Sequence, residues 1–474
     1  AADGRVCFYI PDRIVEGYGP NAAALKRLKD QGAAVAVTVD CGTTAHAPLA
    51  AAAEAGLDVI VVDHHAAEAG LPPALAIINP NRIDEQSPHR QLAAVGVTFL
   101  LAVAVNRALR QRGWYETRPE PDLRLLLDLV ALGTVCDVVP LTGLNRVLVA
   151  QGLKIMGQRG NRGLAALADE AGLKERCGAY HLGFLLGPRV NAGGRVGGAD
   201  LGTRLLTTED PDEARELAAK LDQLNRDRRV IEAAVLDDAM AQVEAGPRDG
   251  LILVAGDDWH PGVIGIVAGR LRERYERPAC VVAFDGALGK ASGRSVSGVN
   301  LGAAVIAARH EGLLVNGGGH AQAAGFTVKR EKLAALRRFL AERIAADASG
   351  VGPHLTLDGA LSLRAASSEL VAVLEQMGPF GVGNPEPRFA LARTHVVRAD
   401  IVGEKHVRCI LADQTGARLP AIAFRSVDTP LGQALLNQGG AYHIAGCLRA
   451  DEWRGVTRVQ LQIEDAAPTH ADAA

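Results

Sequence analysis

Apolar residues in the N-terminal part of the chain form short unbroken runs that alternate with helical patterns. The runs are Val6–Ile10, Ala34–Asp40 (AVAVTVD), Asp58–Asp63 (DVIVVD) and Ala76–Ile78. Ala23–Gln31 and the alanine-rich Thr44–Gly56 lie between them and have helical spacing. Strands of continuous apolar character that alternate with helices are typical of a parallel sheet buried on both faces. The pattern therefore predicts an α/β fold at the start of the chain.

Helical patterns dominate from Gln91 to about Glu175, and one of them is strongly apolar. The apolar run Leu92–Val105 is too short to span a bilayer, and we interpret it as a buried helix. A longer charged and amphipathic pattern follows at Asp212–Gln242. Asp210-Pro211 before it suits a helix cap followed by a first-turn proline, and Gly246-Pro247 after it suits a helix end. We expect a helix that connects two α/β regions.

The C-terminal half predicts a second α/β region and then a small β-barrel. The second region begins at Leu251–Val254 and extends to about Ala346, with a boundary near Gly350–Pro353. Short strand-like runs with turn signals follow at Phe389–Val396, His406–Leu411, Leu419–Phe424, Ala441–Cys447 and Thr457–Ile463. Runs of this length and spacing are typical of a barrel.

Composition narrows the class of protein. A chain of 474 residues that is 48% hydrophobic is too long for one core, so we expect a folded protein of several domains. The 7 cysteines are scattered without a CxxC pair, which argues against a disulfide framework and favours a reducing cytoplasm. No signal peptide is expected. The net charge of −3 shows no basic excess, so a groove for nucleic acid would have to be a local basic patch.

Acids and histidines follow two of the predicted strands. Asp40 ends one strand, and Asp63-His64-His65 ends the next. The carboxyl ends of parallel strands meet at one sheet edge, so these side chains should lie together, and carboxylate with imidazole suits Mn²⁺, Fe²⁺ or Zn²⁺. Asp137, within ALGTVCDVVPL, is the only charge between Asp128 and Arg146 and needs a partner. Taken alone, an Asp at a strand end is more often a helix cap or a turn residue, and a histidine pair is more often a surface accident. Asp137 alone could cap the helix that follows it.

Several motifs together resemble a known family. VTVDCG, VVDHH and ALGTVCDVVPL resemble the second, third and fourth motifs of the DHH phosphoesterases, and GKASGRSVSGVNL and VNGGGHAQAAGF resemble their DHHA1 domain. IPDRIVEGYGPN, LGPRVNAGGR, WHPGVIGIVAGRL and GPFGVGNPEPRF are similar to the RecJ branch of that family. The resemblance covers nearly the whole chain. It implies a DHH domain at 1–210, a connecting helix at 211–246, a smaller α/β DHHA1 domain at 247–348 and an OB-fold barrel at 353–467.

The resemblance also implies roles for individual residues. Asp40, His64 and Asp137 would be metal ligands in a site for two Mn²⁺ or Mg²⁺ ions, with Asp40 bridging the two. His65 and His320 would face the phosphate being cut, and Asp63 would orient a histidine. The implied contacts to the DNA end and its phosphates are Arg13, Tyr18, Arg189, Asn191, Arg195, Ser292, Arg294, Ser295, Gly318 and Gly319. The implied strand-binding candidates on the barrel are Lys405, Arg408, Phe424, Tyr442, Arg449, Trp453 and Arg454.

The function implied by the resemblance is that of a hydrolase, a metal-dependent 5′→3′ exonuclease. It would degrade single-stranded DNA to 5′-mononucleotides in repair and recombination, with single-strand-binding protein and a helicase as partners. The first motif of the family would lie upstream of IPDR, and we interpret Ala2-Asp3-Gly4 as a chance echo of it. We therefore expect an N-terminally truncated chain that binds at most one metal well.

Three alternatives stay open from the sequence. An oligonucleotide or cyclic-dinucleotide phosphodiesterase would share the motifs, but the barrel and the GPFGVGNPEP segment argue against it. A scaffold that binds single strands without cutting them would fit a missing first motif. An inorganic pyrophosphatase is disfavoured because it has no use for the barrel.

Overall fold

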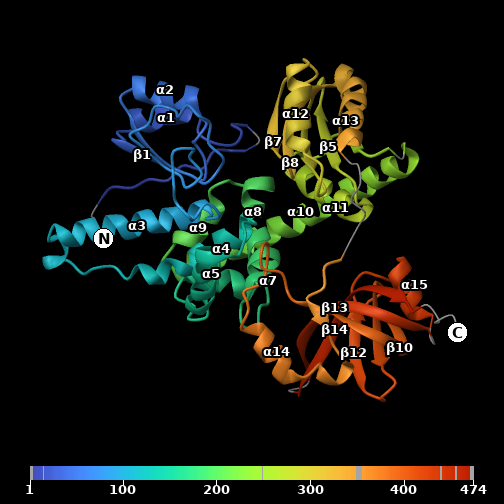
Figure 1. Cartoon of the computed structure of the whole chain (residues 1–474). Helices are drawn as coiled ribbons and strands as arrows, with labels where there is room; N and C mark the ends of the chain where they lie inside the picture. The colour runs from blue at the N-terminus through green and yellow to red at the C-terminus, as the bar shows by residue number, and fades with distance from the viewer. Residues whose placement is uncertain are drawn as a thin grey trace. The chain divides into compact units, whose positions relative to one another are not determined.

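The protein was analysed as a computed structural model, which describes residues 4–13, 15–247, 249–347, 355–437, 440–453 and 456–469. Its chain divides into two compact units (Figure 1). The first unit consists of residues 1–136 and 151–352, and the second of residues 137–150 and 353–474. The expected boundary near Gly350–Pro353 lies outside the described residues.

A parallel sheet begins the first unit, as the apolar runs predict. Its strands lie in the order β1 (Val35–Val39), β2 (Asp58–Val62) and β3 (Ala76–Ile78). α1 (Ala22–Asp30) and α2 (His46–Glu54) pack on it around the buried side chains of Leu25, Leu49 and Val61. The register pairs Val39 with Val62, so β1 and β2 end side by side. This register brings the acids that follow the two strands to one edge.

Two predictions for this region are wrong. Val6–Ile10 forms no strand, and Val6 is 91% exposed. The helix predicted at Leu92–Val105 exists as α3 (Ala94–Gln111), but it is not buried along its length, since Leu100, Val103 and Val105 are 38–48% exposed. Apolar composition shows that these residues favour burial but does not identify what covers them.

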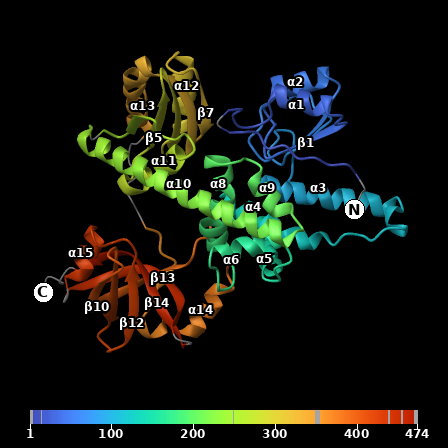
Figure 2. The same ribbon diagram turned by 180° about the vertical axis from the view of Figure 1, so that it is seen from behind.

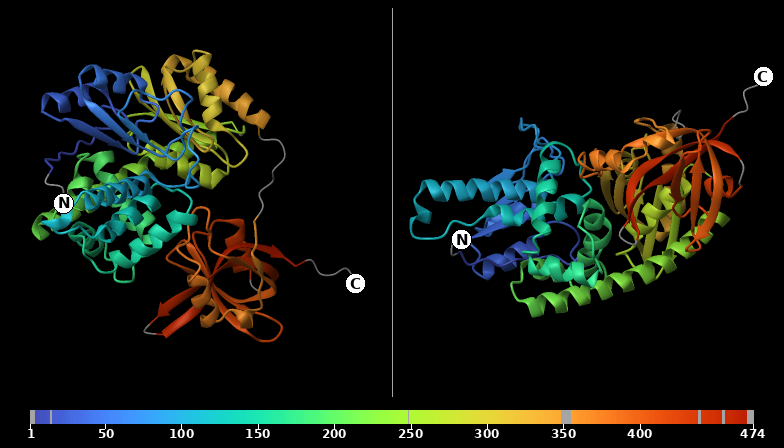
Figure 3. Two further views of the ribbon diagram at one scale, coloured as in Figure 1. Left: turned by 60° about the vertical axis from the view of Figure 1, so that its left-hand side comes forward. Right: turned by 90° about the horizontal axis from the view of Figure 1, so that it is seen from below.

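Further helices complete the middle of the chain. They are α4 (Leu127–Cys136), α5 (Gly143–Met156), α6 (Arg162–Glu170), α7 (Ala179–His181), α8 (Gly187–Val196), α9 (Leu201–Thr207) and α10 (Pro211–Ala245). Figures 2 and 3 show α10 as one uninterrupted helix. Asp210 caps it by accepting hydrogen bonds from the backbone N–H groups of Asp212 and Glu213, and Pro211 is its first residue, which confirms the predicted start. α10 is the connection between the two α/β regions of the first unit.

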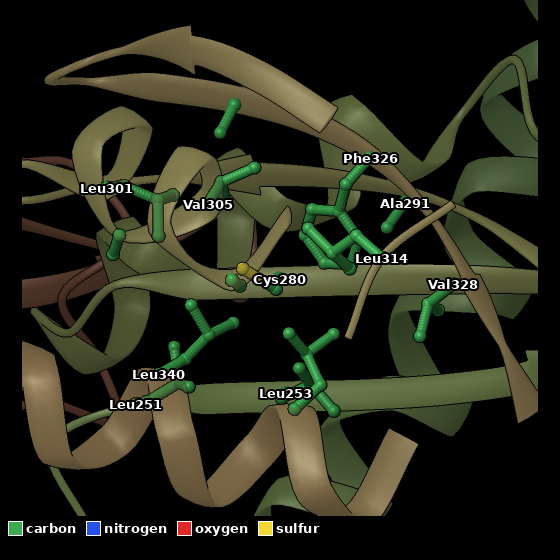
Figure 4. Close-up of a cluster of buried hydrophobic side chains, with 14 of the residues drawn as sticks. Leu251, Leu253, Cys280, Ala291, Leu301, Val305, Leu314, Phe326, Val328 and Leu340 are labelled. Atoms are coloured by element: carbon green, nitrogen blue, oxygen red, sulfur yellow. The ribbon is translucent and has the colours of Figure 1, made fainter. Parts of the chain in front are cut away.

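The second α/β region is a mixed sheet with helices on both faces. The strands are β4 (Ile252–Asp257), β5 (Ala279–Asp285), β6 (Leu288–Arg294), β7 (Asn316–His320) and β8 (Ala323–Lys329), in the order β4-β5-β6-β8-β7. α12 (Leu301–His310) and α13 (Leu333–Asp347) cover one face, where Leu253, Leu301 and Phe326 are buried together (Figure 4). α10 and α11 (Ile264–Tyr275) cover the other face.

The second unit is the expected barrel. Its strands are β10 (Arg388–Val402), β11 (His406–Ala412), β12 (Arg418–Ala423), β13 (Ala441–Trp453) and β14 (Val456–Pro468), and β10 also pairs with β11, which closes the barrel (Figure 3). Short β9 (Gly359–Ala360) adds to β10, and α14 (Ser368–Glu375) and α15 (Pro430–Leu436) pack against the barrel. The five predicted strands are confirmed as β10 to β14, and most of them are longer than predicted.

A segment from the middle of the chain belongs to this second unit. Arg146 donates to the carbonyl oxygens of Met377 at 2.6 Å and Gly378 at 3.3 Å. The N–H of Leu141 donates to the Val382 carbonyl oxygen at 2.6 Å. A Cβ on Gly381 would lie 2.8 Å from a methyl of Leu141, so the GPFGVGNPEP loop needs its glycine there. This loop therefore serves to hold residues 137–150.

We expect Gly152→Ala to destabilise the helices that surround the first unit's core. A Cβ at Gly152 on α5 would lie 2.0 Å from the Leu127 carbonyl oxygen and 2.6 Å from the Ala131 side chain on α4. The two helices would have to separate at a cost of about 1–3 kcal/mol or more, which outweighs the roughly 1 kcal/mol that alanine gains in helix propensity. Thermal unfolding followed by circular dichroism measures the change.

The matched control is Gly269→Ala on α11, where the added Cβ meets no atom of the described residues within 4 Å. This variant should unfold at the wild-type temperature or slightly above it. Equal unfolding temperatures for the two variants would contradict the close approach of α4 and α5.

Candidate metal centre and phosphate-binding site

The turn after β1 places Asp40 at the sheet edge in an unusual conformation. Asp40 has φ +61°, in the left-handed region, and its N–H donates to the Val62 carbonyl oxygen at 2.9 Å. Gly42 has φ +117°, and a Cβ there would lie 2.8 Å from the Thr38 hydroxyl. Non-glycine residues in this region are strained, and such strain gathers at functional sites. The VDCG turn thus folds the Asp40 carboxylate back over the end of β2.

Asp63 after β2 is a buried anchor. Its carboxylate accepts from the N–H groups of Thr43 at 3.0 Å, His64 at 2.8 Å and His65 at 3.2 Å, and it lies 2.7 Å from His65 Nδ1. Burial raises the pKa of Asp63, but the bonds from His65 and Thr43 outweigh burial and leave the pKa below its usual value. The bond to Asp63 also raises the pKa of His65. Asp63 therefore holds His65 and leaves the opposite ring nitrogen to face outward.

Asp40, His64 and His65 form the candidate metal cluster. One ligand atom from each lies within 4.8 Å of the others, and His64 Nε2 is 3.3 Å from Asp40 Oδ1. Asp40 Oδ1 is buried and accepts no hydrogen bond from the residues that the structure describes. A carboxylate with two imidazoles fits a first-row divalent ion. The Tyr18 hydroxyl donates to the Asp40 carbonyl oxygen at 2.5 Å and so connects the cluster to the IPDRIVEGYG segment.

Asp137, the third acid expected to bind metal, directly follows α4 and is exposed. Val138 after it has φ +61°, which marks a tight turn at this point. The residue falls in the second unit. Its place among the metal ligands stays a prediction.

Arginines gather beside the cluster. Burial, together with the charges of Arg13, Arg228 and Arg294, lowers the pKa of Arg195 to about 10. The Arg13 guanidinium lies 6.0 Å from the centre of the Tyr18 ring. Such a group of cations favours an anion, and guanidinium groups suit phosphate. We call Arg13, Arg195 and Arg294 the arginine group.

The SGRS turn contributes Arg294 from the end of β6. Arg294 donates to the Ser292 hydroxyl at 3.2 Å, and burial lowers its pKa. A Cβ on Gly265, in the first turn of α11, would lie 3.0 Å from the Ser292 hydroxyl oxygen. This glycine therefore allows the helix N-terminus, with its positive dipole end, to approach Ser292 and Arg294. Ser295 turns away, since it is buried and its hydroxyl donates to the Val299 carbonyl oxygen at 2.8 Å.

The LGPRVNAGGR segment forms most of α8, and its polar residues differ in position. Arg189 is half-buried and donates to Asp222 of α10 at 2.8 Å, so its charge is matched within the protein and we leave it out of the arginine group. Asn191 is exposed. Arg195 donates to the Gly262 carbonyl oxygen at 3.1 Å, in the turn before α11.

His320 ends β7 and reaches the metal cluster. Its ring lies 6.4 Å from that of His65, with 20° between the planes. Gly319 before it has φ +155°, and a Cβ there would lie 2.4 Å from the Ala323 carbonyl oxygen. Gly318 is half-buried in the same strand. The glycines let the hairpin present His320 beside its turn, where His320 pairs with Ala323.

The sequence analysis missed the support behind the arginine group. Arg228 on α10 is buried and pairs with Glu232 at 2.6 Å, and Arg270 of α11 lies 3.4 Å from the same acid. Glu232 is thus the acid that offsets the cations packed around it. The available signal in the sequence was the spacing of four residues between Arg228 and Glu232. Opposite charges at this spacing are also common on exposed helix faces, so the signal did not identify a buried pair.

The barrel candidates are mixed. Phe424 is 52% exposed and lies 5.2 Å from the His406 ring, so it is available for stacking. Tyr442 is buried and donates to the Ala434 carbonyl oxygen, which makes it a core residue and not a platform. Arg408 lies 3.7 Å from Asp400, and Arg449 pairs with Glu386 at 2.7 Å. Lys405 is exposed beside the β10–β11 turn. The Trp453 side chain and Arg454 lie outside the described residues.

Family comparisons agree with this geometry along the chain. The model of the DHH family, N-terminal domain, matches residues 2–134. The DHHA1 domain matches residues 249–346, and the RecJ OB domain matches residues 357–465.

Known proteins are similar to this chain over nearly its whole length. A single-stranded-DNA-specific exonuclease RecJ of Salmonella typhimurium is 37% identical over 98% of this chain and 82% of its own length. RecJ of Thermus thermophilus, solved with Mn²⁺, is similar with a TM-score of 0.79 and 31% identity, over 94% of this chain and 64% of that one. The Mg²⁺ complex of the Thermus protein gives a TM-score of 0.73 at 28% identity, over 95% of this chain and 70% of that one. The chain belongs to the RecJ family of DHH phosphoesterases.

Proposed function

We propose that this protein is a metal-dependent exonuclease that removes 5′-mononucleotides from single-stranded DNA during repair and recombination. The observation that carries the proposal is the direct link between the metal cluster and the arginine group. Tyr18 bonds to Asp40 in the cluster, and Arg13 of the arginine group lies against the Tyr18 ring. The relatives named single-stranded-DNA-specific exonuclease RecJ support single-stranded DNA as the substrate.

The chain's own residues explain how such an enzyme would cut near an end. Asp40, His64 and His65 would hold a divalent ion, Mn²⁺ or Mg²⁺ as in the Thermus structures. When bound, such an ion activates water and withdraws charge from phosphate oxygens. The arginine group, with Ser292, would bind a terminal phosphate and so position the next phosphodiester for cleavage. Asp63 fixes His65, and His320 adds a second imidazole beside it.

We also propose a cellular location and partner proteins. All 7 cysteines, which the structure describes, are thiols, and this supports a reducing cytoplasm. No helix within the described ranges is long and apolar enough to cross a membrane. The proposed protein partners, single-strand-binding protein and a helicase, rest on the family resemblance.

The first test is release of mononucleotides from a 5′-phosphorylated single strand in Mn²⁺. It should use this chain and the same chain preceded by a relative's upstream segment, because the chain spans 82% of the length of the Salmonella relative. Cleavage of the single strand, with a dinucleotide cut less well, is the expected result. Tight strand binding without cleavage in both forms would favour a binding scaffold, and preference for the dinucleotide would favour an oligonucleotide phosphodiesterase.

Asp40→Asn should lower cleavage at least about 100-fold and weaken Mn²⁺ binding. Asparagine tolerates the left-handed backbone of Asp40, so the variant removes the charge and little else. Calorimetry with Mn²⁺ and the cleavage assay give two independent readouts. The control is Asp58→Asn, an exposed acid at the start of β2 that should behave as wild type. Wild-type Mn²⁺ affinity in Asp40→Asn would remove Asp40 from the metal ligands.

Arg294→Ala should reduce the preference for a 5′-phosphate over a 5′-hydroxyl end. The lost guanidinium would have donated charge-assisted hydrogen bonds, typically worth about 1.5–3 kcal/mol each, so the preference should fall about 10- to 100-fold. Competition between the two ends on one strand measures it. Arg343→Ala, an exposed arginine on α13, is the control. An equal loss on both ends would argue against a phosphate contact.

A further inference from the structure

Two exposed aromatic rings stand together on the first unit, away from the metal cluster. Tyr180 and Phe184 are 63% and 70% exposed, and their rings stack with centres 5.1 Å apart at 26°. Single exposed apolar residues are normal on a protein surface, whereas a stacked pair of exposed rings forms a flat apolar surface. We call Tyr180 and Phe184 the aromatic pair.

The aromatic pair is held rigidly from behind. Both rings project from a continuous helical stretch in which α7 leads into a π-helical turn, Leu182–Leu186, and then into α8. Leu182 and Leu186 are fully buried on the opposite side. A Cβ on Gly187 would lie 2.3 Å from the Cys136 sulfur, so this side packs directly on α4. A rigid, pre-organised aromatic surface binds at a lower entropic cost than a mobile one.

The same helix ends in the arginine group. Phe184, Asn191 and Arg195 recur at helical spacing along one side of the stretch, and Asn191 between them is exposed. The eleven residue steps from Phe184 to Arg195 correspond to roughly 16 Å of helix. That length equals about five nucleotides of a stacked strand at about 3.4 Å each, and fewer if the strand is stretched.

The charge around the aromatic pair also suits nucleic acid. Lys174 and Arg176 are exposed in the loop before α7. The loop is pinned to the helix, because His181 Nε2 lies 2.7 Å from Glu175 and the Gly178 N–H donates to His181 Nδ1 at 3.0 Å. Cations beside stacked aromatic rings are the usual features of a single-strand path.

We propose that the aromatic pair is a stacking platform for bases of the single strand, about three to five nucleotides from the end held by the arginine group. The proposal rests on the proposed function, because it assumes that the arginine group holds a strand end. It adds a second contact that makes affinity depend on strand length. A strand too short to reach from Arg195 to Phe184 would gain nothing from the platform.

The test compares the chain with the double variant Tyr180→Ala/Phe184→Ala in strand binding. Fluorescence anisotropy with 5′-phosphorylated strands of three to twelve nucleotides, in EDTA to prevent cleavage, measures affinity without requiring activity. The wild-type chain should gain about 10-fold or more in affinity as the strand lengthens past the platform, since each stacked base contributes severalfold or more. The double variant should lose that gain, and Tyr180→Phe should keep it.

A second readout places the contact along the strand. 2-Aminopurine substituted at successive positions should be quenched at about the third to fifth nucleotide by the wild-type chain, and not by the double variant. Val230→Ala, an exposed side chain on α10, is the matched control. Unchanged length dependence and quenching in the double variant would overturn the proposal. A lowered unfolding temperature or an altered oligomeric state without loss of the length-dependent gain would also overturn it.

These outcomes separate the platform from the proposed function. If the wild-type chain and its extended form bind strands without cutting them in Mn²⁺, the exonuclease proposal fails and the platform is still judged by length dependence. If cleavage occurs and length dependence survives in the double variant, the platform alone fails.

Discussion

The buried carboxylate of Asp63 is the interaction on which the metal centre depends. It accepts bonds from Thr43, beyond the end of β1, and from His64 and His65, beyond the end of β2. One side chain thus ties together the two loops that carry the candidate ligands. An unbonded carboxylate would be costly at this depth, so the surrounding N–H groups fix both its charge and its position. The backbone of Asp40 has a positive φ, which is strained for a non-glycine residue. The hydrogen bonds that hold the two loops to Asp63 stabilise this conformation.

In the phosphate-binding part of the site, arginine side chains are packed closely, and acidic side chains balance only part of their charge. Burial and mutual repulsion weaken the hold of Arg195 on its proton, and Glu232 with Arg228 forms a matched pair directly behind. Largely buried ion pairs such as that of half-buried Arg189 with Asp222 add little net stability but connect neighbouring helices. The excess positive charge that remains is stabilised best by an anion. Binding energy for a phosphate is therefore built into the folded state before any strand arrives.

Much of this arrangement was predictable from local patterns. Strand ends carrying Asp40 and Asp63-His64-His65, the capped helix after Asp210 and the five barrel strands all have short-range signals, and the structure contains them. Two kinds of feature were not predictable. Val6–Ile10 and the outer side of α3 have apolar composition without the partner that would bury them. Arg189 and Ser295 have the chemistry of phosphate ligands, but Arg189 pairs with the distant Asp222 and Ser295 bonds to the nearby Val299 carbonyl oxygen, so both are used within the protein.

The attachment of residues 137–150 to the second unit has a consequence for synthesis on the ribosome. Arg146 must wait for Met377, which follows 231 residues later in the chain. At about 5–20 residues per second, the delay is on the order of tens of seconds. Throughout that interval Leu141 lacks its contacts with Gly381 and Val382. The nascent protein would thus expose an internal apolar side chain until residues 377–382 have been synthesised.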